Sequence, residues 1–60
     1  MLNNLPNDPM MLLSVVNTKL RDIYKDLDAL CDDINVNRRD LEDKLSMIDY
    51  KYDSSLNKFV

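Results

Sequence analysis

The sequence contains no histidine and no glycine, and Cys31 is its only cysteine. Without histidine, the chain lacks the side chain that titrates near neutral pH and the commonest metal ligand. A single cysteine excludes a disulfide within the chain, and the absence of glycine removes the loop that cradles phosphate groups. Because an enzyme needs a nucleophile with its base, a metal centre or such a cradle, we expect a protein without catalytic activity and without a cofactor.

Size is the second constraint, since 60 residues allow only one domain. A domain this small buries about 60% of the surface that its unfolded chain exposes, and its core rarely supplies more than roughly 3–5 kcal/mol. Small natural domains often add a disulfide, a metal or self-association. Because the first two are disfavoured here, the sequence favours self-association.

Charge and hydropathy narrow the range of partners. Eight basic and eleven acidic side chains give a net charge of −3, which provides no general attraction to nucleic acid or anionic lipid. The apolar run from Met10 to Val16 is much shorter than the roughly 20 residues of a membrane span, and no signal peptide surrounds it. With one unpaired cysteine, the sequence therefore predicts a cytoplasmic protein that contacts neither a membrane nor a small-molecule substrate.

Local signals place the first helix. Residues 1–7 contain a proline and three asparagines, which is typical of a short irregular arm, and the domain is expected to span residues 8–60. Asp8 suits the N-cap position and Pro9 the first helical position, so a helix is predicted from Pro9 to Tyr24. Its core-facing side chains recur at helical spacing: Leu12, Leu13, Val16, Leu20, Ile23 and Tyr24. In the arm, Leu2 and Leu5 can still pack on the domain.

Two short helices follow, separated by a tight turn. Asp26 is the N-cap candidate of the first, which is predicted to end at Asn35. Asn37 is the N-cap candidate of the second, which is predicted to reach Ile48. Asn35 is expected to be left-handed and Val36 to be a buried anchor, as in a helix-turn-helix unit. The apolar stripes are Leu27, Leu30, Cys31 and Ile34, then Leu41, Leu45 and Ile48, with Met47 filling core gaps beside them.

After residue 48 the apolar period changes from 3.6 to 2, which indicates strands. A loop over residues 54–57, ending in a left-handed Asn57, predicts a hairpin with two opposed pairs: Tyr52 with Phe59, and Asp53 with Lys58. The aromatic pair and Tyr50 are expected to pack on the helices while the charged pair faces outward. The predicted fold is therefore mainly α, a three-helix helix-turn-helix-like core with a C-terminal β-hairpin, similar to a winged helix.

The order of these segments resembles a known family. The matching segments are Leu5 to Asp22 (LPNDPMMLLSVVNTKLRD), Leu27 to Asp33 (LDALCDD), Ile48 to Asp53 (IDYKYD) and Asn57 to Val60 (NKFV). Together they resemble the small bacterial proteins grouped as domain of unknown function 4250, over nearly the whole chain. The resemblance implies a free-standing bacterial protein, and it brings no established activity, substrate or site.

Two groups of residues are candidates for a reactive or metal-binding site, but a structural role explains each of them more simply. Cys31 lies on an apolar stripe, which favours an inert core thiol over a redox site. Four aspartates, Asp26, Asp28, Asp32 and Asp33, lack the spacing of a calcium-binding loop and belong to a helix. We therefore expect no metal site and a solvated acidic face.

The first hypothesis for function is a protein-interaction module, foremost a homodimer and otherwise a complex with another protein. Its expected interface comprises Met10, Met11, Val15, Asn17 and Arg21. Met11 and Val15 lie on a flank outside the core-facing stripe, four residues apart. There they either contact the C-terminal hairpin or form an exposed apolar patch for a partner.

The alternative hypothesis is a helix-turn-helix DNA-binding regulator, in which the second helix of the unit enters the major groove. Its nucleic-acid contacts would be Arg38, Arg39, Lys51 and Lys58. The same helix also carries Asp40, Glu42 and Asp43, so it has no excess of positive charge where phosphates would lie. The charge pattern therefore favours the interaction module.

Overall fold

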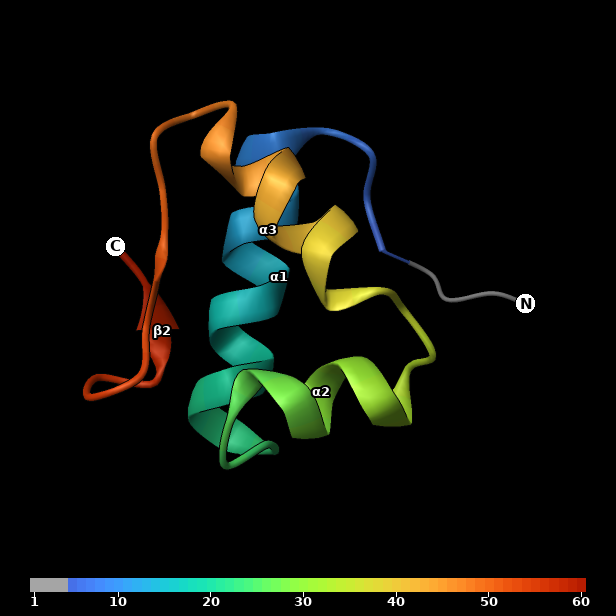
Figure 1. Ribbon diagram of the computed structural model, residues 1–60, viewed down its shortest axis with the longest axis vertical. Coiled ribbons are helices and arrows are strands. Elements are labelled where there is room, and N and C mark those ends of the chain that lie inside the picture. Colours follow the sequence, from blue (N-terminus) through green and yellow to red (C-terminus); the bar gives the residue numbers. More distant parts are fainter. Residues whose placement is uncertain (1–4) are drawn as a thin grey trace.

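The computed structural model describes residues 5–60, so the first four residues of the predicted arm, Leu2 among them, lie outside the described residues. The elements follow one another as α1 (Pro9–Asp22), α2 (Leu27–Asp33), α3 (Arg38–Ser46), β1 (Tyr52–Asp53) and β2 (Lys58–Phe59). In Figure 1, α2 runs across the lower end of α1, and the hairpin lies along the side of α1. The predicted class, a mainly helical domain of three helices with a C-terminal hairpin, is confirmed.

All three predicted N-caps are confirmed. The Asp8 carboxylate accepts from the N–H of Met11 at 3.0 Å, and Pro9 occupies the first helical position. The Asp26 carboxylate accepts from the N–H of Ala29 at 2.7 Å. Asn37 Oδ1 accepts from the backbone of both Arg39 and Asp40. These bonds satisfy N–H groups that have no partner within their own helix.

The helices end earlier than predicted, each for a local reason. The first ends at Asp22 rather than Tyr24, because Ile23 leaves helical geometry with a φ of −123° and the chain turns toward the extended Asp26 cap. The second ends at Asp33, since Asn35 has a φ of 58° and cannot continue a helix. The third ends at Ser46 rather than Ile48. The N–H groups of residues 47–49 each donate to the carbonyl three residues before them, so a tight turn replaces the last predicted helical residues.

The core combines all three helices with the last strand. The buried side chains are Leu12, Val16, Leu20, Leu27, Leu30, Cys31, Leu41, Leu45 and Phe59. Leu5, Leu13, Tyr24, Ile34, Val36, Ile48, Tyr50 and Tyr52 pack against them and are partly buried. Val36 is thus a half-buried anchor, and Leu5 joins the arm to the domain.

Two core assignments from the sequence were wrong. Ile23 is 65% exposed, because it follows the last helical residue and no longer obeys the helical spacing that placed it on the core side. Met47 is 76% exposed for a different reason, since its backbone is still helical and the helical spacing turns its side chain away from the stripe of Leu41 and Leu45.

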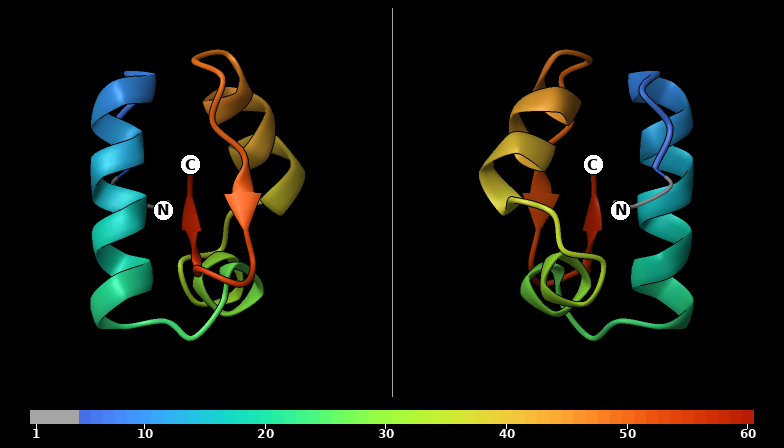
Figure 2. Two further views of the ribbon diagram at one scale, coloured as in Figure 1. Left: turned by 90° about the vertical axis from the view of Figure 1, so that its left-hand side faces the viewer. Right: turned by 90° about the vertical axis from the view of Figure 1, so that its right-hand side faces the viewer.

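The predicted hairpin register is confirmed, with Tyr52 opposite Phe59 and Asp53 opposite Lys58. The aromatic rings of the first pair meet at a centroid distance of 5.6 Å and an interplanar angle of 56°. Beyond the two-residue strands, Lys51 and Val60 exchange both of their backbone hydrogen bonds, at 3.0 and 2.8 Å. Figure 2 shows that β2 lies next to α1 and that β1 forms the far edge of the hairpin.

Among residues 5–60, three non-glycine residues are left-handed, Asn35, Asp49 and Asn57, with φ of 58°, 65° and 53°. The first and the third were predicted, and Asp49 was not. Asparagine and aspartate enter this region more readily than other residues with side chains, which suits a chain without glycine. No helix among residues 5–60 is long and apolar enough to span a bilayer.

The left-handed turn between α2 and α3 makes a testable prediction. Replacing Asn35 with alanine should lower the free energy of unfolding by about 1 kcal/mol. The reason is that alanine has a Cβ, which disfavours positive φ, but lacks the short polar side chain with which asparagine tolerates it. Replacing Asn35 with glycine should be neutral or stabilising. Urea denaturation measures both, with the exposed Asn7→Ala as the control, and equal effects of alanine and glycine would contradict the prediction.

Candidate functional site

The expected interface residue Asn17 has a structural role. Its Nδ2 donates to the carbonyl of Phe59 at 3.1 Å, and its Oδ1 accepts from the N–H of Phe59 at 2.8 Å. Because Lys51 and Val60 form a hydrogen-bonded pair, the next pair, Tyr52 and Phe59, directs its backbone groups away from the hairpin. The carboxamide of Asn17 therefore takes the place of a third strand at the outer edge of β2.

Asn57 forms a second link, which the sequence did not reveal. Its Nδ2 donates to the carbonyls of Leu20 and Tyr24, both at 3.1 Å, near the end of α1. Its Oδ1 accepts from the hydroxyl of Tyr52 at 2.7 Å, and that hydroxyl accepts from the N–H of Leu27 at 3.3 Å. The one available signal was the predicted inward position of Tyr52, since a buried tyrosine hydroxyl usually finds a partner.

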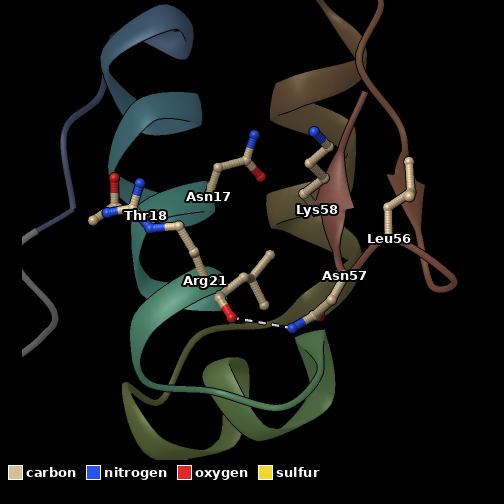
Figure 3. Close-up of a pocket in the computed structure, with 7 residues that line it drawn as sticks. Asn17, Thr18, Arg21, Leu56, Asn57 and Lys58 are labelled. Carbon is tan, nitrogen blue, oxygen red and sulfur yellow. Dashed lines mark hydrogen bonds between the residues drawn. The ribbon is translucent and has the colours of Figure 1, made fainter.

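A groove of about 640 Å³ lies between α1 and the hairpin. Its lining consists of Asn17, Thr18, Leu20, Arg21, Leu56, Asn57 and Lys58. Figure 3 shows that the charged ends of Arg21 and Lys58 lie on opposite sides of this groove and do not converge. Arg21 also forms two hydrogen bonds with Asp22, at 2.9 and 3.0 Å. The groove thus lacks the converging cations that an anion-binding site needs.

The other four expected interface residues lie on two lines along α1. Met10 and Arg21 are exposed on the same side of the helix as Asn17, and Met11 is exposed above the half-buried Val15 on a second line. Met10 and Met11 are 56% and 60% exposed, respectively. Of the two alternatives for Met11, its exposure fits the open patch rather than burial under the hairpin.

The expected nucleic-acid contacts do not form one cluster. Arg38 donates to Asp28 at 2.8 Å and to Glu42 at 3.3 Å, and its guanidinium lies 5.5 Å from the centre of the Tyr52 ring. Arg39, Lys51 and Lys58 are exposed. Alternation along the strands puts both lysines on the outer face of the hairpin, opposite to the face of Tyr52. Arg38 is therefore separated from the two lysines.

Residues 6–59 match the model of a protein family described as Domain of unknown function (DUF4250). The chain belongs to this family. No curated protein and no solved structure matches the chain. Membership of DUF4250 thus confirms the resemblance seen in the sequence, and the family description itself names no function.

Three of the four aspartates of the expected acidic face have local partners in this DUF4250 protein. Asp26 caps α2 and Asp28 pairs with Arg38, while Asp33 accepts from the hydroxyl of Tyr24, which raises the pKa of that tyrosine. Within the described residues, no group of three or more histidine, cysteine, aspartate and glutamate side chains is arranged to hold a metal ion.

The two hydrogen bonds between Asn17 and Phe59 are expected to stabilise the fold, so their loss should lower the free energy of unfolding. Replacing Asn17 with alanine should lower the free energy of unfolding by about 2 kcal/mol, because it leaves the N–H and the carbonyl of Phe59 without their partner. Thr18→Ala, a change at the neighbouring exposed position, should stay within about 0.5 kcal/mol. Thermal or urea denaturation compares the two variants, and a similar small loss in both would refute the role of the amide.

We predict that the thiol of Cys31 is alkylated slowly in the folded protein. The side chain is only 5% exposed, and its burial raises the pKa of the thiol. Because the thiolate is the reactive form, the folded protein should react with iodoacetamide at pH 8 at least about tenfold more slowly than the urea-unfolded protein. Mass spectrometry follows the adduct over time, and equal rates in the two states would contradict this expectation.

Proposed function

We propose that this domain is a non-enzymatic protein-interaction module that forms a homodimer and binds another protein through the exposed start of α1. The observation that supports the proposal is the pair of consecutive methionines, Met10 and Met11, which are 56% and 60% exposed on a domain with a closed core. Methionine is flexible and polarizable, so it adapts to apolar surfaces of varied shape. Val15, half-buried below Met11, extends this surface.

Energetics support a role for such a surface. Burying one large apolar side chain fully contributes on the order of 1.5–3 kcal/mol, which is large beside the stability of a domain of this size. The homodimer part of the proposal rests on the low stability expected of so small a domain, since a lone cysteine provides no disulfide to stabilise the fold. We also propose a cytoplasmic location, because an unpaired cysteine is typical of reducing compartments.

We do not advance the DNA-binding alternative. Arg38, the expected contact that begins α3, already pairs with two carboxylates, and using it for a phosphate would mean breaking those pairs. Glu42 and Asp43 lie on the same short helix. Their negative charge opposes the approach of a phosphate backbone.

The surface is tested by a photoreactive benzoyl-phenylalanine placed at position 11 of the full chain in cells that express it. We expect one discrete adduct with another protein, at least about tenfold more abundant than from the same group at the exposed Asp32 of α2. The double variant Met10→Ser with Met11→Ser should leave the free energy of unfolding within about 1 kcal/mol of wild type, because both side chains are mainly exposed.

Equal labelling from positions 11 and 32 would refute a binding surface on α1. An adduct of two copies of this 7.1 kDa chain would instead make α1 the self-association surface. Sedimentation of the wild-type protein at several concentrations tests the homodimer separately, and a monomer at every concentration would remove that part of the proposal.

A further inference from the structure

The hairpin has one closed edge and one open edge. At β2 the outward backbone groups of Phe59 are bound by Asn17. At β1 the outward groups belong to Tyr52, and in the described part of the chain neither its N–H nor its carbonyl has a hydrogen-bond partner. An unpaired strand edge is a template for pairing with a further strand.

The space beside this edge is open. A groove of about 350 Å³ lies along it, with Glu42, Asp43 and Ser46 of α3 on one side and residues 50–52 on the other. Figure 2 shows β1 on the side of the hairpin away from α1, so an added strand would not meet that helix. The backbone of Tyr52 thus borders this groove, and α3 forms its other wall.

We propose that β1 of a second copy of this chain occupies the edge, so that two β1 strands pair antiparallel about a twofold axis at Tyr52 and form a four-stranded sheet. The N–H of each Tyr52 donates to the carbonyl of the other, which satisfies the open groups of both copies. The contact uses the same surface in both copies, as a closed twofold dimer requires. It deepens the homodimer part of the proposed function and depends on it.

Charge selects this register. With Tyr52 opposite its copy, Lys51 of each chain lies opposite Asp53 of the other, on the outer face of the sheet. A shift of two residues would place Lys51 opposite Lys51 or Asp53 opposite Asp53, and like charges directly opposite are destabilising. A shift of one residue would pair inward with outward side chains. The sequence around Tyr52 is thus complementary to itself.

The side chains that would meet are in place for this contact. Lys51 is exposed. The three hydrogen bonds that Asp53 accepts from the loop, two from Ser55 and one from Leu56, all go to Oδ1, so Oδ2 remains for Lys51 of the second copy. The hydrogen bond from the Ser55 hydroxyl is the main reason that the pKa of Asp53 is lowered, and the carboxylate is therefore charged at neutral pH.

The decisive variant is Lys51→Asp, studied by sedimentation equilibrium on the full chain. It places two aspartates opposite each other at two symmetric positions, so the dimer dissociation constant should rise at least about tenfold. Lys25→Asp makes the same change in net charge at an exposed position far along the chain from β1, and it should leave dimerisation unchanged. Mixing Lys51→Asp with Asp53→Lys should restore a dimer, because unlike charges then face each other at both positions.

Amide hydrogen exchange gives a readout that does not depend on a variant. The N–H of Tyr52 is unpaired in one copy, so its exchange should slow at least about tenfold as concentration rises through the dissociation constant. The N–H of Lys51, which bonds to Val60 within the hairpin, serves as the reference that is protected throughout. Exchange of Tyr52 that is independent of concentration would overturn the inference.

The outcomes separate this inference from the proposed function. A wild-type dimer that Lys51→Asp leaves intact, together with an adduct of two copies at position 11, would disprove pairing at β1 while the interaction module stands. A wild-type protein that is monomeric at all concentrations would disprove pairing at β1, and labelling of another protein from position 11 would still support the module.

Discussion

The structure depends on how a hairpin with strands of only two residues is held against a helix. Such a hairpin is barely stable alone in water, and here side-chain amides fix it at two points. Asn17 binds the backbone of Phe59, and Asn57 binds the carbonyls at the end of α1. These bonds place the Phe59 ring in the core, where it meets side chains from the helices. Removing either amide would therefore weaken polar and apolar contacts together.

Internal contacts also decide which parts of the surface are free for partners. Arg38 and Asn17 were each expected to meet a partner, and both are engaged within the fold. The methionines at the start of α1 and the outer backbone of Tyr52 are not engaged in this way. The surfaces that we propose for interaction are thus those that the internal contacts leave exposed.

The sequence predicted the features that depend on near neighbours. Asp8, Asp26 and Asn37 cap their helices because each N-cap bond spans two or three residues. The hairpin register followed from the alternation of aromatic and charged residues. The helix ends were less accurate, since they depend on turns imposed by the next element. The hydrogen bonds of Asn17 and Asn57 escaped prediction because the partners lie 42 and 37 residues away, and no local pattern marks such a bond.

The separation of Asn17 from Phe59 has a consequence for how the chain folds. Closing a loop of 42 residues costs more entropy than forming any of the short turns between the helices. The helices and their turns rely on local contacts, which form quickly. We therefore expect the hairpin to dock late in folding, and until it docks the apolar surface that later covers Phe59 would be open to water and to other chains.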